Sequence, residues 1–311
     1  MHMSLPNPLP DILLAMRYIY LLCTMTLVNF SLPRGWSVPA HKMIASVAYK
    51  NLDESTREYL KSFISVSTDV ELENWMVSKS TWADTDGGDH AMNHFVHVTK
   101  CDDPEKMRLQ CGSSKETEGK CVTEALVNHI YTAISKRGGE PVRDAMKYLI
   151  HYIGDIHQPL HVALAADFGG NTLHRIRPFL STDPVTRRDR SVNLHEIWDF
   201  SLFDNAISKR TFYETEFESV SAGSLDFGRE NFQSAATMRR HVHQIAFETA
   251  GEVTCRSAYF DGVNFVKSDD FLTPEYIQQG RRDVVKQVLR AGIRLAHLLT
   301  TISRIRIDNK V

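Results

Sequence analysis

The 311-residue chain is 42% hydrophobic and 24% charged, a composition that suits a folded core and excludes intrinsic disorder. Its formal net charge at pH 7 is −2, so the basic surface typical of a protein that binds duplex DNA is absent. We expect one globular domain.

The N-terminal segment is typical of a secretory signal peptide. Tyr18 to Leu32 form an apolar run that is too short to cross a bilayer comfortably. We therefore predict that residues 1–35 are a removed signal peptide and that residues 36–311 form the mature domain. That domain would be secreted, or would lie in the lumen of the secretory or endolysosomal pathway. A variant of this interpretation starts translation at Met16, and the alternative makes the apolar run the first buried helix of the domain.

One of the five cysteines, Cys23, falls within the predicted signal peptide. The even number that remains indicates two disulfide bonds in a secreted protein. Four cysteines allow three pairings, but the short polar loop between Cys111 and Cys121 favours a local bridge and leaves Cys101 to pair with Cys255. No apolar stretch near the C-terminus is long enough for a membrane anchor.

Helical patterns dominate the predicted mature chain and place it in the all-α class. Apolar residues recur at helical spacing in segments 41–52, 55–64, 70–82, 122–136, 142–158, 194–206, 236–250 and 274–302. The last segment is the clearest, because Thr273 is a helix cap, Pro274 suits a first turn, and a long apolar stripe follows. The segments 84–121 and 163–192 are rich in Gly, Asp, Ser and Pro and are predicted to be loops, with a short hairpin around residues 173–180.

Two of the predicted helices carry histidine and aspartate one turn apart. His151 and Asp155 lie on one face of the 142–158 helix, and His195 and Asp199 repeat that spacing on another helix. Each pair has the spacing to chelate a metal ion. A solvated helix pair is the alternative, but the residues around His151 are apolar, and buried polar groups need partners.

Further potential ligands lie close to these pairs. Pro159 cannot continue a helical hydrogen-bond ladder, so the chain should turn there and direct His161 toward a second metal ion. Asp84 ends a predicted helix and His94 lies ten residues later, so a loop could return the histidine to the carboxylate.

The predicted mature N-terminus supplies one more candidate. Cleavage after Gly35 would free the α-amine of Trp36, whose nitrogen and carbonyl oxygen could chelate zinc with His41 alongside. These nitrogen and oxygen ligands together predict a multinuclear zinc hydrolase.

In the order and spacing of its motifs, the chain resembles the class I zinc nuclease family, which includes fungal single-strand-specific nucleases, plant bifunctional nucleases and trypanosomatid 3′-nucleotidases. The matching motifs are Trp-x4-His at 36–41, Trp-Ala-Asp at 82–84, His-Phe-Val at 94–96, His-x3-Asp-x-His-Gln-Pro-Leu-His at 151–161, Asp-x-Gly-Gly-Asn at 167–171 and Asn-Leu-His-x2-Trp-Asp at 193–199. The resemblance covers nearly the whole predicted mature chain. It implies the all-α, single-domain, multi-helix phospholipase C/class I nuclease fold with a trinuclear zinc cleft.

By that resemblance, each chain binds three Zn²⁺ ions. One is held by Asp84, His94, His151 and Asp155, a second by His161, His195 and Asp199, and a third by the N-terminus of Trp36, by His41 and by a shared Asp155. The resemblance also suits both disulfide pairings. It makes Asp84 and Asp155 catalytic candidates, and Asn171, on the Gly-Gly loop, a candidate substrate contact. His157 is not a ligand in the family and is interpreted either as a histidine that supports the ligands or as a core histidine.

The sequence departs from the family pattern at two places in the site. Ser37 and Ala40 replace glycines near Trp36, so the turn that presents the N-terminus is expected to differ. His97 stands where the family usually has an acidic residue after His-Phe-Val, which removes a carboxylate that orients the attacking water or the substrate. We therefore count His97 among the catalytic candidates.

The resemblance implies a zinc-dependent phosphodiesterase that hydrolyses single-stranded DNA and RNA to 5′-phosphate products and has 3′-nucleotidase activity. Zinc ions would supply a hydroxide nucleophile near neutral pH. A single strand is favoured because its phosphate and an unstacked base reach the site together. Single-stranded nucleic acid and 3′-nucleotides are therefore the expected partners, as substrates of a monomer with no stable protein partner and no membrane anchor.

A group of arginines lies between the two ligand segments: Arg175, Arg177, Arg187, Arg188 and Arg190. They could guide a phosphate backbone toward the metal ions. A solvated loop is the alternative, because most charge runs are only that.

Two other functions fit the same fold. A zinc phospholipase C would hydrolyse lipid phosphodiesters and would show an apolar or interfacial lip. A catalytically weakened zinc-binding secreted protein would keep its metal ions for stability, an interpretation motivated by His97. Turnover of choline lipids would indicate the first, and full zinc occupancy without phosphodiesterase activity the second.

Overall fold

The computed structural model describes residues 36–309 apart from 87–90, 102, 113–116, 136–137, 179–191, 204–231 and 233. The described part is mostly helical, which confirms the predicted all-α class. None of its helices combines the length and the apolar character needed to cross a membrane. The predicted signal peptide lies outside the described residues.

The longer helices are α2 (Val38–Lys50), α3 (Glu54–Ile64), α4 (Asp69–Lys79), α6 (Val122–Ser135), α7 (Glu140–Asp155), α11 (Ala235–Thr249) and α12 (Pro274–Asn309). The shorter ones are α5 (Trp82–Thr85), α8 (Leu194–Glu196), the 3₁₀ turns η1 (Ala91–His94), η2 (Pro104–Lys106), η3 (Pro159–His161) and η4 (Ala165–Asp167), and the π-helical segments η5 (Ile197–Ser201) and η8 (Ala250–Ala258). Helix starts follow local chemistry: Thr68 and Glu71 form a capping box at α4, and Asp53 caps α3 by accepting a hydrogen bond from the Thr56 amide.

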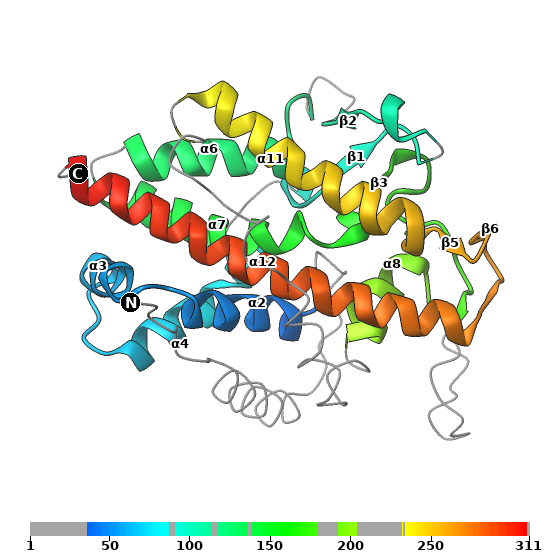
Figure 1. Ribbon diagram of the computed structural model, residues 1–311, viewed down its shortest axis with the longest axis horizontal. Helices are drawn as coiled ribbons and strands as arrows, with labels where there is room; N and C mark the ends of the chain where they lie inside the picture. Colours follow the sequence, from blue (N-terminus) through cyan, green and yellow to red (C-terminus); the bar gives the residue numbers. More distant parts are fainter. Residues whose placement is uncertain are drawn as a thin grey trace, which may run out of the picture.

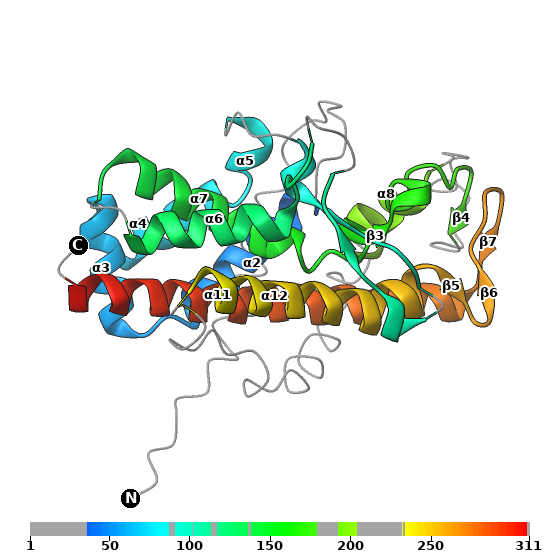
Figure 2. The same ribbon diagram turned by 90° about the horizontal axis from the view of Figure 1, so that it is seen from above.

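Helix α12 is a long central element against which α2, α3, α6 and α7 pack. In Figure 1 it crosses the whole molecule, with α2 on one side and α6 and α11 on the other. Its buried stripe packs against α2 and α7, and α2 approaches so closely at Gly292 that an added Cβ would lie 2.4 Å from Val47 Cγ1. Figure 2 shows α6 and α7 forming the layer beside α12. Helices α2 and α7, which carry His41 and His151, are therefore held against one rigid element.

A small sheet connects two segments of the chain that the sequence leaves as loops. Its strands are β2 (Leu109–Gln110), β1 (Val96–Val98) and β3 (Val162–Leu164), with β1 antiparallel to β2 and parallel to β3. Because Val96 pairs with Val162, the histidines just before the two strands, His94 and His161, come together. The other strands are β4 (Arg177–Pro178), β5 (Phe260–Asp261), β6 (Asn264–Phe265) and β7 (Phe271–Leu272).

The prediction of a hairpin around residues 173–180 is wrong, because the strand in this segment pairs with a distant strand. Strand β4 pairs in parallel with β7, and Ile176 forms a bridge with Val192. The Arg177 guanidinium lies 4.7 Å from the centre of the Phe271 ring, a contact that favours this distant pairing. Residues 179 and 180 lie outside the described part of the chain.

Several helix boundaries also differ from prediction, and α12 continues to Asn309 rather than ending at residue 302. Segment 70–82 divides into α4 and α5, because the Ser80 carbonyl turns to accept a hydrogen bond from His151 Nδ1. Helix α7 ends at Asp155, three residues before its predicted end, and tight turns follow it. Segment 194–206 is a short α-turn followed by π-helix as far as it is described.

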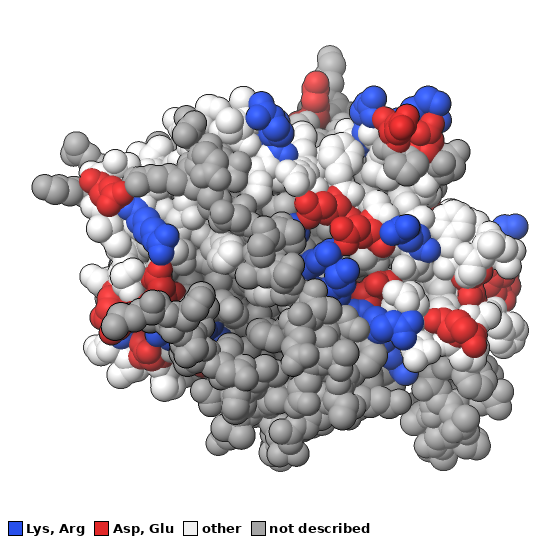
Figure 3. Space-filling view, viewed as in Figure 1, with Lys and Arg blue, Asp and Glu red and all other residues white. Residues whose placement is uncertain are grey.

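Two disulfide bonds tie the loops to the helices. Cys101 is joined to Cys255 in η8, and Cys111 is joined to Cys121. These are the two pairs that the sequence favours. Where the residues of the face in Figure 3 are described, acidic and basic side chains are interspersed, in agreement with a net charge close to zero.

Candidate metal centre

Helix α7 presents His151 and Asp155 on one buried face. Both side chains have no exposed surface, and His151 Nε2 lies 3.1 Å from Asp155 Oδ2. Nonpolar residues of α7 fill its remaining buried surface, including Leu149, Ile150 and Ile153. Polar atoms in such surroundings need a strong partner, so this helix is the natural base of a metal site.

A first group forms where α5 and η1 meet α7. It consists of Asp84, His94 and His151, whose ligand atoms all lie within 4.8 Å of one another. Asp84 Oδ1 is 3.6 Å from His94 Nδ1 and 3.5 Å from His151 Nε2. His94 Nδ1 is also 3.0 Å from Asp155 Oδ2, so Asp155 belongs to this group as well.

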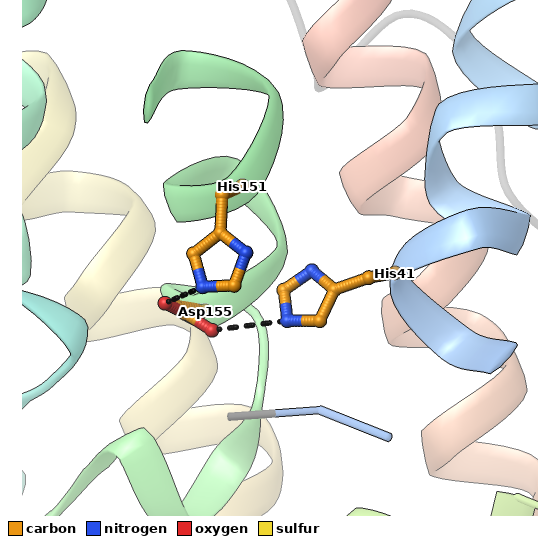
Figure 4. A group of neighbouring side chains, drawn as sticks. All are labelled: His41, His151 and Asp155. Atoms are coloured by element: carbon orange, nitrogen blue, oxygen red, sulfur yellow. Dashed lines mark ion pairs between the residues drawn. The ribbon is translucent and has the colours of Figure 1, made fainter. Parts of the chain in front are cut away.

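A second group forms where α2 meets α7. Figure 4 shows Asp155 beside His151, with one ion pair from its carboxylate to His151 and one to His41. His41 Nε2 lies 3.4 Å from Asp155 Oδ1, while the other carboxylate oxygen faces His151. The two imidazole rings stack at 4.1 Å. Asp155 therefore lies between two groups and offers one oxygen to each.

A third group lies beyond the turn that follows α7. His161, at the end of η3, joins His195 and Asp199 from α8 and η5, and the three ligand atoms lie within 4.8 Å of one another. His195 Nε2 is 3.3 Å from Asp199 Oδ2. The turn at Pro159 that the sequence predicts is thus present, and it directs His161 to this group.

Backbone carbonyls orient three of these histidines. The Nδ1 atoms of His151, His161 and His195 lie 2.7, 2.8 and 2.7 Å from the carbonyl oxygens of Ser80, His94 and Gly169. A carbonyl oxygen can only accept, so in each neutral ring Nδ1 carries the proton and Nε2 keeps its lone pair. Such hydrogen bonds are typical of histidines that bind metal ions, because they fix the ring and its tautomer.

The three groups contain buried polar atoms that lack hydrogen-bond partners, as expected for atoms that bind a cation. Five buried atoms of the groups have no hydrogen-bond partner among the described residues: both ring nitrogens of His41, one oxygen each of Asp84 and Asp155, and Asp199 Oδ2. Burial raises the pKa of Asp199 well above its usual value and also raises the pKa of Asp84. A divalent cation at each group would satisfy His41 Nε2 and the carboxylate oxygens and would reverse both pKa shifts. Imidazole and carboxylate ligands of this kind suit zinc.

Burial and the nearby carboxylates also shift the pKa values of the histidines at the site. Burial lowers the pKa of His161 to about 3 and lowers that of His195, so both rings are neutral near pH 7, which is the form that binds metals. Burial opposes charge on His151 as well, but attraction to Asp155 outweighs it and raises the pKa of His151 to about 9. That attraction in turn holds the pKa of Asp155 well below its usual range. A metal ion that binds here would displace the proton from His151 Nε2 and take its place beside the Asp155 carboxylate.

Trp36 lies against the backbone of the ligand-bearing segments. Its side chain is buried, its indole Nε1 donates to the Gly154 carbonyl at 2.9 Å, and the amide of Ser37 donates to the Asp199 carbonyl at 3.2 Å. An added Cβ on Gly154 would lie 2.8 Å from His41 Nδ1. The start of the described chain, His41 and the end of α7 therefore pack as one unit.

The remaining candidates lie around the groups rather than in them. Asn171 donates to the Phe168 carbonyl at 2.8 Å within its own loop. His97 lies in β1, opposite Gln110 and Ala163, and burial lowers its pKa; it belongs to none of the three groups. His157 is fully buried, donates to the Ile153 carbonyl and accepts a hydrogen bond from Arg294, contacts that fit the predicted core histidine.

The arginines of segment 163–192 have local partners where they are described. Arg175 forms an ion pair with Asp269, and Arg177 lies over the Phe271 ring. Arg187, Arg188 and Arg190 lie outside the described residues.

Several groups that orient the ligands are not predicted from the sequence. The carbonyls of Ser80 and Gly169 are backbone atoms, for which residue type carries no signal. Gln158 did have a signal, because it lies between Asp155 and His161 in the densest ligand motif.

Comparison with known proteins gives one family. The family model described as S1/P1 Nuclease matches residues 36–304. Endonuclease 2 of Arabidopsis thaliana is 26% identical over 286 residues, which cover 86% of this chain and 90% of the relative. Nuclease S1 of Aspergillus oryzae is 24% identical over 294 residues, 89% of this chain and 95% of the relative. Nuclease P1 of Penicillium citrinum is 23% identical over 287 residues, 86% of this chain and 97% of the relative.

Proposed function

The chain belongs to the S1/P1 nuclease family, and from that membership we propose a zinc-dependent nuclease that hydrolyses single-stranded DNA and RNA to 5′-phosphate products. We propose 3′-nucleotidase activity at the same site. The observation that carries the proposal is the convergence of three histidine and aspartate groups around α7, with Asp155 between two of them.

The proposed ligands are divided among three zinc ions. Asp84, His94, His151 and Asp155 would hold the first, and His161, His195 and Asp199 the second. His41 and Asp155 would hold the third, together with the α-amine and carbonyl of Trp36 after removal of residues 1–35. The burial of Trp36 and the hydrogen bond from Ser37 to Asp199 support this last assignment.

Zinc, when bound, supplies Lewis acidity and lowers the pKa of water toward neutrality. Asp84 and Asp155 are the proposed catalytic carboxylates, because their unpartnered oxygens lie where the groups converge. The hydrogen bonds from Nδ1 to backbone carbonyls fix the orientation of three imidazoles and place the Nδ1 proton, so that Nε2 is the nitrogen available to a metal ion. The net reaction adds a water oxygen to phosphorus and breaks the P–O3′ bond, which leaves a 5′-phosphate and a 3′-hydroxyl.

The substrate contacts are proposed from position. Asn171 lies on the loop whose Gly169 carbonyl orients His195, and its amide, which donates to the Phe168 carbonyl, is the proposed contact for a nucleotide that enters there. His97, in place of an acidic residue, would offer a neutral imidazole near β3. We further propose a secreted or luminal location, which the two disulfide bonds support.

The test is hydrolysis of single-stranded DNA, RNA and 3′-AMP by the secreted protein, with chelator and with zinc added back. We expect chelator-sensitive release of 5′-phosphorylated fragments and a zinc content of three per chain. A His151→Ala/Asp155→Ala variant should lose the cleavage activity and the full zinc content. His174→Ala, at an exposed histidine outside the three groups, should keep the activity and the zinc content.

Two results would contradict the proposal. A zinc-loaded protein that cleaves no nucleic acid would indicate a binding role, and restoration of cleavage by His97→Asp would then identify the cause. Turnover of choline lipids in preference to nucleic acid would indicate a lipid phosphodiesterase.

A further inference from the structure

Gln158 is a fully buried amide in the turn between α7 and η3. A buried amide without hydrogen-bond partners would destabilise the fold by about 1–3 kcal/mol. This one has partners on both of its polar atoms, and all of them belong to, or lie next to, proposed ligands of a single zinc ion.

The carbonyl oxygen of Gln158 organises the turn that carries His161. Gln158 Oε1 accepts hydrogen bonds from the Leu160 amide and, at 3.3 Å, from the His161 amide. Backbone N–H groups can only donate, so they establish which end of the Gln158 amide is oxygen. The side chain thus caps η3 and holds the backbone of His161 in place.

The amide nitrogen of Gln158 determines how Asp199 is presented. Gln158 Nε2 donates to Asp199 Oδ1 at 2.5 Å, across 41 residues of sequence. The other oxygen, Asp199 Oδ2, is buried without a hydrogen-bond partner among the described residues and lies 3.3 Å from His195 Nε2. One oxygen is occupied, and the other is left for a metal ion.

We propose that Gln158 is a positioning residue for the zinc site formed by His161, His195 and Asp199. It joins the two segments that supply the ligands and makes Asp199 bind through Oδ2 alone. This inference rests on the proposed function, because it assumes that the third group binds zinc.

The first test separates the two contacts of the Gln158 amide. Gln158→Glu keeps an acceptor for the two backbone amides but replaces the donor by an anionic oxygen that faces Asp199. We expect the affinity for one of the three zinc ions to fall by about 10–100-fold, as measured by competition with a chromophoric chelator. Gln278→Glu makes the same chemical change at an exposed position of α12 and should leave all affinities unchanged.

The second test reverses the hydrogen bond. In Asp199→Asn, Gln158 should hold the oxygen of the introduced amide and turn its NH₂ group toward the ligands, so that one zinc ion is lost. In Gln158→Glu/Asp199→Asn, the introduced carboxylate should accept from that NH₂ group and turn the amide oxygen back toward the ligands. We expect zinc affinity at this site to recover about tenfold relative to Asp199→Asn.

Recovery in the double variant would support a positioning role even if Gln158→Glu alone does not fold, because a merely structural role predicts two additive losses. Unchanged zinc affinity in folded Gln158→Glu, or no recovery in the double variant, would overturn the inference and leave the proposed function standing. A wild-type chain that binds no zinc would overturn both.

Discussion

At the scale of single residues, the loop of Gly169 and Gly170 places His195. Gly169 adopts φ +65°, its carbonyl accepts from His195 Nδ1, and an added Cβ would lie 2.3 Å from the Leu160 carbonyl oxygen. Asp167 stabilises the loop by accepting hydrogen bonds from the Gly170 amide and from the Tyr259 hydroxyl. Residue 169 must therefore be a glycine if its carbonyl is to orient His195.

We predict that Gly169→Ala selectively weakens the third group. The collision with Leu160 must shift the Gly169 carbonyl and release His195, so affinity for one zinc ion should fall by about 10–100-fold. Gly262→Ala is the matched control, because Gly262 has φ +63° but nothing within 4 Å of an added Cβ. Both variants should lose about 1–2 kcal/mol of stability from the left-handed backbone. Equal zinc affinities in the two variants would contradict the prediction.

At the scale of elements, one ion pair holds α11 against α6. Arg239 Nε and Nη2 each lie 2.8 Å from the Glu124 carboxylate, and His243 lies nearby. Hydrogen bonds from His243 and Arg239 lower the pKa of Glu124 to about 2, from an ordinary value of 4.5. A folded-state pKa below the unfolded one means that the ionised carboxylate stabilises the fold above pH 4.5 and that this contribution is lost as the pH falls toward 2.

We expect Arg239→Gln to lower the free energy of unfolding at pH 7 by about 1 kcal/mol, the upper range for a partly exposed pair. The difference from wild type should shrink as the pH falls from about 4.5 toward 2, because protonated Glu124 no longer attracts Arg239. Urea unfolding over this pH range measures it. The neighbouring Arg240→Gln should show little effect at any pH, and a pH-independent loss in Arg239→Gln would refute the ion-pair explanation.

Helices α2 and α12 meet at Gly292, where there is no room for a side chain. Gly292→Ala would bring a Cβ to within 2.4 Å of Val47 Cγ1 and 3.1 Å of the Ile44 carbonyl oxygen, so we predict a loss of stability. Overpacking of this kind costs about 1–3 kcal/mol. Thermal unfolding should show the loss, a Val47→Ala substitution in the same chain should restore part of it, and Gly251→Ala, with nothing within 4 Å, should be neutral or slightly stabilising.

At the scale of the whole molecule, the disulfide bonds differ in the length of chain they close. Cys101 and Cys255 are 154 residues apart, and Cys111 and Cys121 are 10 apart. The longer bridge ties the segment after β1 to η8 and so joins the small sheet to the helical core.

We predict that Cys101→Ser/Cys255→Ser is the more destabilising pair of substitutions. Loop-closure entropy gives about 5 kcal/mol for the longer loop and about 3 kcal/mol for Cys111→Ser/Cys121→Ser. Chemical unfolding of the two variants with equal zinc content tests the order. An equal loss in both would mean that native-state contacts, rather than restriction of the unfolded chain, account for the effect.

What the sequence by itself determined is local in origin. Helical periodicity and caps predict α3 and α6 to within one or two residues at each end, because the responsible contacts join residues three or four apart. The same periodicity puts His151 beside Asp155 and His195 beside Asp199. The other ligand candidates came from residue type and position in the sequence, and the family resemblance divided them among three zinc ions.

What only the tertiary structure decided depends on partners that are far apart in the chain. The Ser80 carbonyl ends α4 and orients His151 across 71 residues, and strand β1 pairs with β3 across a similar distance. Gln158 reaches Asp199 across 41 residues and determines which carboxylate oxygen is left for a metal ion. No local pattern encodes these pairings, since they arise only when burial forces each polar group to find an acceptor or donor within the assembled core.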